Sequence, residues 1–152
     1  MTGAWQKIIA IGEIVGGVLA LSATVFAAGA GASKSSVALG AALDLLVLVA
    51  GVALWFRPAT GIVLSEVAMA LQSVQVFTDW FVWQYIAGAA LLVQVIGGEI
   101  QWSGGLIVRH TFFQDEGSNG TGLGVNVIAI AAAAFLIVTR MRDRSAHPEG
   151  TA

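Results

Sequence analysis

Four long apolar runs alternate with short polar breaks along the chain. They cover residues 8–28, 37–56, 59–77 and 122–139. Each has about the 20 apolar residues that a helix needs to cross roughly 30 Å of hydrocarbon. A Gly/Ser-rich segment and the Arg57-Pro58 pair separate the first three runs, and proline disfavours helix in the residue before it. The pattern predicts an all-α integral membrane protein, a four-transmembrane-helix bundle.

The segment between the third and fourth runs, residues 78–121, has a different pattern. Residues 81–98 are apolar enough for a fifth span, but they are rich in Val, Ile and aromatic side chains. They lead into EIQWSGGLIVRHTFFQ, where SGG separates two runs of strand-favouring residues. We therefore expect a small β-rich excursion outside the membrane, with a fifth span as the alternative.

The distribution of basic residues favours four spans. With four, one side of the membrane carries five basic residues and the other carries two; with five, the better orientation gives four against three. Positive charge stays cytoplasmic, so both termini are expected in the cytoplasm. The five are Lys7, Arg57, Arg140, Arg142 and Arg144, and the two are Lys34 and Arg109. Residues 1–144 then form a single membrane domain, and residues 145–152 form a disordered tail.

Composition supports a lipid environment. Apolar residues make up 57% of the 152 residues and charged residues 11%, against about 45–50% and about 25% in soluble domains. The first run is longer than the roughly 7–15 apolar residues of a signal peptide, so we expect it to be retained. The net charge of −2 gives no basic field for nucleic acid, and there is no cysteine. The Ala/Gly/Val-rich chain is typical of a bacterial, multi-pass inner-membrane protein.

Six polar side chains interrupt the apolar runs. At 1.5 Å per residue, two acids lie at a depth of about 8 Å, one acid and one amide at about 18 Å, and two amides at about 21–22 Å. Polar groups of different helices thus share levels, as expected if they contact one another. In order of depth they are Glu13 and Glu66, Asp44 and Gln72, and Gln75 and Asn126.

These groups have a structural and a functional interpretation. Amides such as Gln72, Gln75 and Asn126 commonly form hydrogen bonds between helices in membranes. Glu13 and Glu66 lie shallow enough to reach Lys7, Arg57 or interfacial water. Asp44 has no Lys or Arg at its depth, so we expect it to be protonated, hydrogen-bonded to an amide or open to water. It is equally a candidate for binding protons or cations.

The first run also carries small residues four positions apart. Gly12, Gly16 and Ala20 form a GxxxG row that lets another backbone approach closely. Packing within this chain is the favoured interpretation, and homo-oligomerisation is the alternative.

No catalytic motif accompanies these features. The chain lacks the nucleophile-elbow, zinc-protease, P-loop and dinucleotide-binding patterns. His110 precedes two acids, but a solvated surface explains that cluster better than a metal site. We therefore expect no catalytic residue, metal or cofactor. The predicted function is a non-enzymatic scaffold or accessory subunit, with the bilayer and a membrane protein as partners. The alternative is a proton- or cation-linked transporter or channel subunit.

Overall fold

The computed structural model describes residues 2–78, 81–112 and 121–146 and shows four helices with one antiparallel sheet. This is an α+β fold, so the prediction of an all-α four-helix bundle is wrong. Within the described residues, two helices, α1 and α2, are long and apolar enough to span a membrane. In chain order the elements are α1 (Thr2–Gly29), α2 (Lys34–Phe56), α3 (Pro58–Ser73), β1 (Val74–Phe77), β2 (Val82–Ile96), β3 (Glu99–Phe112), β4 (Gly122–Asn126) and α4 (Val127–Ala146).

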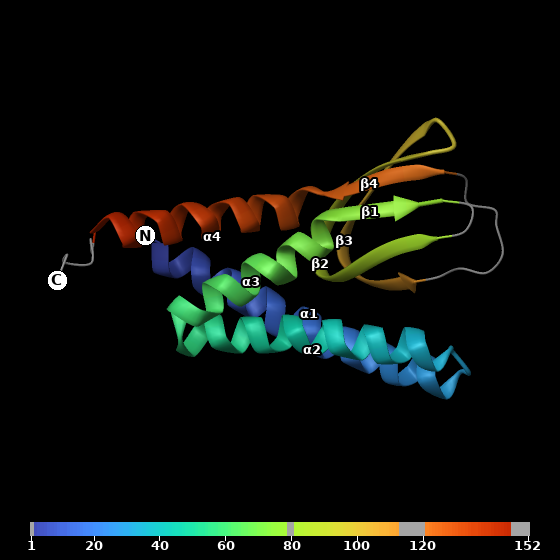
Figure 1. The fold of residues 1–152 in the computed structure, drawn as a ribbon, viewed down its shortest axis with the longest axis horizontal. Coiled ribbons are helices and arrows are strands. Elements are labelled where there is room, and N and C mark those ends of the chain that lie inside the picture. Colours follow the sequence, from blue (N-terminus) through green and yellow to red (C-terminus); the bar gives the residue numbers. More distant parts are fainter. Residues whose placement is uncertain (1, 79–80, 113–120, 147–152) are drawn as a thin grey trace.

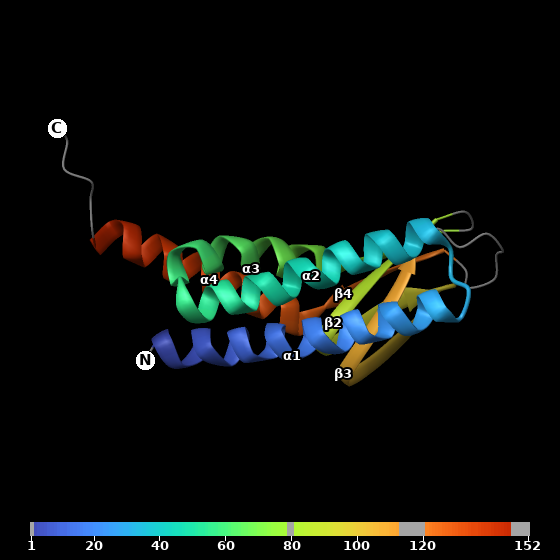
Figure 2. The same cartoon turned by 90° about the horizontal axis from the view of Figure 1, so that it is seen from below.

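The helices α1 and α2 form an antiparallel hairpin that runs along the whole molecule (Figure 1, Figure 2). Their contact is close because glycines face the partner backbone. A Cβ on Gly17 would lie 2.8 Å from the Leu48 nitrogen, and one on Gly51 would lie 2.8 Å from the Ala10 oxygen. The helices α3 and α4 lie at the end that carries the termini, and the sheet lies beside the other end of the hairpin (Figure 1).

The third and fourth apolar runs change from helix to strand within their length. The run 59–77 is helical only to Ser73 and then continues as β1, while the run 122–139 begins as β4 and becomes helical at Val127. Both were predicted to be helical throughout. The strand portions are VQVF and GLGVN, which combine β-branched residues and glycine. A continuous apolar run has no periodicity that separates these portions from buried helix.

The β2–β3 hairpin occupies most of the predicted excursion, so residues 81–98 are not a fifth span. Its turn is at Gly97 and Gly98, whose φ angles are +59° and +85°. The expectation of a turn at SGG is wrong, because Ser103, Gly104 and Gly105 lie within β3. The β-rich character of the excursion is confirmed, but the hairpin packs against α1 and does not stand apart from the helices.

The hairpin is bent back on itself so that the sheet curls. The start of β2 pairs with β1 through Val82 and Trp83, and its end pairs with β4 through residues 92–96. Because β1 also pairs with β4, the two ends of β2 must lie near each other. Within the hairpin, Gly88 and Gly105 have φ angles of +119° and +142°, values that side-chain-bearing residues rarely adopt. The result is a small curled sheet with the two halves of β3 at its margins.

The curled sheet is partly polar inside and apolar outside, and Ile86, Ala90 and Leu92 form a buried apolar cluster on the same face as its glutamines. Its concave face carries three buried glutamines, Gln75, Gln84 and Gln94. Its outer face exposes apolar side chains from three strands: Val93, Val95, Ile100, Trp102, Leu123 and Val125. Sheets that face water have the opposite arrangement, whereas transmembrane barrels place apolar side chains outside and polar ones inside.

Candidate functional site

A buried aspartate is the centre of the candidate site. Asp44 projects from the middle of α2, and it is fully buried. Its Oδ2 accepts a hydrogen bond of 2.7 Å from the Thr24 hydroxyl of α1. Its Oδ1 lies 3.0 Å from His110 Nε2 of β3, within ion-pair distance. The direction of that second contact does not satisfy hydrogen-bond geometry, so we treat it as an electrostatic contact.

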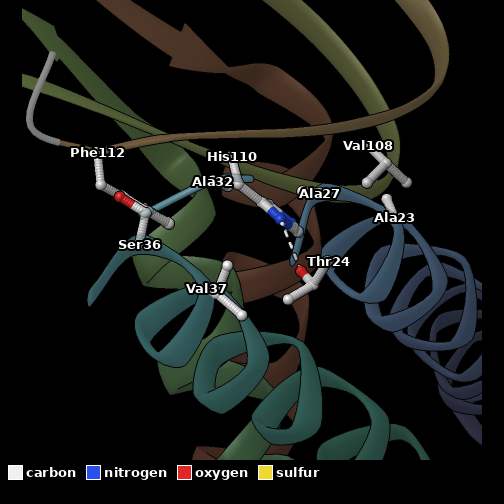
Figure 3. A pocket seen from close by; sticks show the side chains of 9 residues that line it. All are labelled: Ala23, Thr24, Ala27, Ala32, Ser36, Val37, Val108, His110 and Phe112. Atoms are coloured by element: carbon white, nitrogen blue, oxygen red, sulfur yellow. Dashed lines mark hydrogen bonds between the residues drawn. The ribbon is translucent and has the colours of Figure 1, made fainter. Parts of the chain in front are cut away.

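Local sequence explains how these groups meet. Gly40 lies one helical turn before Asp44, and a Cβ there would come within 3.3 Å of the Thr24 hydroxyl and 3.6 Å of His110 Nδ1. The missing side chain therefore leaves room for both groups. Along β3, side chains alternate between the two faces, so His110 points toward the helices while Arg109 points away. Thr24 Oγ1 lies 3.3 Å from His110 Nδ1 (Figure 3). The Thr24 hydroxyl therefore contacts both Asp44 and His110.

Aromatic side chains surround the imidazole. Tyr85 of β2 stacks on His110 with ring centroids 5.3 Å apart, and Phe112 of β3 stacks on His110 at 6.3 Å and on Tyr85 at 6.5 Å, so the three rings form one cluster. Tyr85 is fully buried, and it lies in β2, outside α1 and α2. The Tyr85 hydroxyl also lies beside Asp44. Asp44 therefore faces a histidine, a threonine and a phenol.

A pocket of about 180 Å³ adjoins this cluster (Figure 3). It lies between the end of α1, the start of α2 and β3. His110 and Thr24 provide its polar lining together with Ser36, and the remaining lining is apolar. Both polar groups that contact Asp44, the imidazole of His110 and the hydroxyl of Thr24, thus line the pocket.

The partner of Asp44 is a histidine, which the search for a Lys or Arg at its depth did not consider. His110 was assigned to a solvated excursion, but the hairpin brings it against α2. Asp115 and Glu116, the two acids near His110 in the sequence, lie outside the described residues. One signal could have identified the pair: His110 is the only histidine before the C-terminal tail, and Asp44 was the acid without a partner.

Two of the three amides that were expected inside the membrane bond to backbone. Gln72, in the last turn of α3, accepts a hydrogen bond of 2.9 Å from the Ala87 backbone of β2. Asn126 accepts bonds of 3.3 Å from the Leu91 backbone and 3.4 Å from the Ala129 backbone. These two amides satisfy N–H groups at the bend of β2 and at the start of α4, rather than the side chains of other helices as expected. The third, Gln75, accepts hydrogen bonds from Gln84 and Gln94 of β2.

The two glutamates have different partners from those expected. Glu13 is buried and accepts a 2.7 Å hydrogen bond from Ser65 of α3, while its other oxygen has no hydrogen-bond partner. Glu66 pairs with Arg140 of α4 at 2.8 Å rather than with Lys7 or Arg57. Glu13 and Glu66 were expected at the same depth in the membrane. The contact of Glu13 with Ser65 agrees with that expectation, because Ser65 precedes Glu66 in the chain.

The small-residue row of α1 packs against a strand. A Cβ on Gly16 would lie 2.5 Å from the Ala87 oxygen of β2, whereas one on Gly12 would meet nothing within 4 Å. Ala20 is fully buried in the core beside Val47 and Tyr85. The row therefore permits close packing within the chain, but its partner is the bend of the hairpin instead of a helix.

Metal chemistry has little support in the part of the chain that the structure describes. It contains no group of three or more His, Asp or Glu side chains that could hold an ion. The Asp44–His110 pair supplies two such groups, and its other neighbours are a hydroxyl and a phenol. The arrangement is suited to holding and moving a proton. Comparison of the chain with protein-family models, curated proteins and solved structures found no match.

Proposed function

We propose that this protein is a non-enzymatic integral membrane protein whose Asp44–His110 pair binds a proton in a proton-linked transport or channel function. The observation that carries the proposal is the contact of 3.0 Å between His110 Nε2 and a fully buried carboxylate. Ionisable groups inside membranes are costly and commonly mark proton or ion pathways. Histidine is the side chain whose charge ordinarily changes between about pH 5 and 8.

Two features support the membrane location. The helices α1 and α2 have the length and hydropathy of membrane spans. The curled sheet has an apolar outer face and keeps three glutamines on its inner face, an arrangement that suits lipid outside. We propose that the sheet is embedded beside the outer part of α1 and α2.

The segments that change from helix to strand also have about the length needed to cross a bilayer. The helix α3 has 16 residues and β1 has 4, so together they extend about 37 Å. This is close to the thickness of a bilayer with part of its interfacial regions. Backbone that bends or changes from helix to strand in lipid needs internal hydrogen-bond partners. Asn126 provides one for the Ala129 N–H at the change from β4 to α4, and Gln72 provides one for the Ala87 N–H at the bend of β2.

The proposed orientation places both termini in the cytoplasm of a bacterial cell. The start of α1, the turn between α2 and α3 and the last turns of α4 lie at the end of the molecule with the termini, and the turn between α1 and α2 lies at the opposite end (Figure 1). Lys7, Arg57 and Arg140 belong to the first three segments, and Lys34 begins α2. The excess of basic residues marks the cytoplasmic side. The pocket beside His110 then opens toward the outside, where the external pH would act on the pair.

Infrared titration of the carboxyl region tests the proton site. We expect the wild type to show a pH-dependent carboxyl band that Asp44→Asn removes. His110→Gln should alter the same band. Glu66→Gln, which removes a carboxylate at the other end, is the matched control and should leave that band in place.

Proton flux into liposomes tests the transport function itself. Asp44→Asn and His110→Gln should fold yet lose a pH-driven flux that Glu66→Gln retains. If Asp44→Asn leaves both the band and the flux unchanged, the pair only braces α2 against the hairpin. The scaffold role expected from sequence has no separate support, because lipid alone accounts for the exposed apolar side chains.

A further inference from the structure

The interior of the curled sheet contains a second polar cavity, separate from the Asp44–His110 cluster. Its volume is about 260 Å³. At roughly 30 Å³ for each water, it has room for several waters or a ligand of a few heavy atoms. The lining combines glutamine amides with one cation, and its members are Phe77, Gln84, Gln94, Ile96, Gln101 and Arg109.

Three glutamines from distant parts of the chain meet behind this cavity. The Gln75 carbonyl oxygen accepts a hydrogen bond of 3.3 Å from the Gln84 amide and a second bond from the Gln94 amide. All three side chains are at least nine-tenths buried. Gly124 of β4 leaves room for the three glutamines, because a Cβ at that position would lie only 3.0 Å from the Gln75 side-chain oxygen.

The Gln75 amide nitrogen is a buried donor with no hydrogen-bond partner. Because its carbonyl already accepts two bonds, this nitrogen is the group left to bind something else. Gln75 lies two residues before Phe77, which lines the cavity, so both side chains project from the same face of β1. A buried N–H without a partner is unfavourable, which favours an acceptor at this place.

The mouth of the cavity carries a positive charge. Gln101 and Arg109 come from the two halves of β3, which form the margins of the curled sheet, and both are exposed. Among the described residues, Arg109 has no ion-pair partner, and the cavity lining contains no acidic side chain. The guanidinium group is a planar fork of donors whose geometry matches a carboxylate.

We propose that this cavity binds a small carboxylate anion. Arg109 would bind the carboxylate through paired, charge-assisted hydrogen bonds at the mouth. The glutamine amides would donate to its oxygens or to other acceptors deeper in the cavity. The site is independent of the proton site, because alternation along β3 directs Arg109 into the curled sheet and His110 toward the helices.

Calorimetric titration of the full chain in lipid nanodiscs tests this proposal. The probe is sodium acetate at constant ionic strength, with sodium chloride and ammonium chloride as comparison salts. We expect saturable binding of acetate that chloride and ammonium do not reproduce. Arg109→Gln should weaken binding by about tenfold or more, because it removes a charge-assisted contact.

Lys34→Gln is the matched control, since it removes one positive charge from the same end of the molecule without changing the cavity. It should leave acetate binding within about twofold, because exposed charges are screened beyond roughly 10 Å. Gln101→Leu, at an exposed position, should weaken binding without unfolding the chain. The proposal is overturned if wild type binds no acetate, if Arg109→Gln binds it equally, or if sulfate and phosphate bind more tightly than any carboxylate probe.

Discussion

The two glycines of the GxxxG row should respond in opposite ways to the same substitution. A Cβ on Gly16 would lie 2.5 Å from the Ala87 oxygen, about 0.9 Å short of the 3.4 Å at which ordinary contact begins. It would also lie 2.9 Å from the Ala87 carbonyl carbon, so no flexible side chain can move aside. A Cβ on Gly12 would meet no atom within 4 Å.

The expected free energies follow from these distances. Replacing glycine by alanine inside a helix favours the folded state by about 0.5–1 kcal/mol. That gain should be the whole effect of Gly12→Ala. In Gly16→Ala, overpacking against backbone costs about 1–3 kcal/mol and exceeds the gain. If the Ala87 backbone is displaced, the bond that Gln72 accepts from it weakens too, at about 1 kcal/mol.

Thermal unfolding in detergent, followed by circular dichroism, measures both variants. A difference of about 2 kcal/mol between them corresponds to roughly 4–8 °C in Tm for a chain of this size. Gly12→Ala should unfold at or above the wild-type temperature and Gly16→Ala below it. Equal Tm values for the two variants, or a stabilised Gly16→Ala, would refute the packing of α1 against β2.

Two further predictions concern the amides and the orientation. Gln72→Leu removes the acceptor of the Ala87 N–H and should cost about 1–3 kcal/mol, whereas Gln101→Leu at an exposed position should cost less than about 0.5 kcal/mol. An unchanged Tm for Gln72→Leu would mean that water satisfies that N–H. Single cysteines at Ser33 and Ser145 should react with a membrane-impermeant reagent from opposite sides, since the chain has no cysteine of its own. Labelling of both from one side would contradict the proposed orientation.

Long runs of apolar residues were enough to identify the first two helices. The predicted ranges 8–28 and 37–56 lie within α1 and α2, because length and hydropathy depend only on local sequence. The strand content of residues 81–112 was also visible, since β-branched and aromatic residues favour strands. The polar residues inside the apolar runs were recognisable as sites that need partners.

Tertiary structure decided where the third and fourth runs change from helix to strand. VQVF and GLGVN are apolar enough for either state, and they become strands because they pair with each other and with the two ends of β2. These contacts join residues far apart in sequence, so no local pattern encodes them. The same curl turned Gln75, Gln84 and Gln94 from separate polar positions into one cluster.

The pairing of Asp44 with His110 has the same origin. The sequence by itself determined that a carboxylate lies deep in an apolar helix and that it needs a compensating group. It placed His110 in a separate excursion, 66 residues further along the chain. Only the folding of the β2–β3 hairpin against α1 and α2 brings the imidazole to 3.0 Å from the carboxylate, because strand alternation and the bend at Gly88 together set which face of β3 meets the helices.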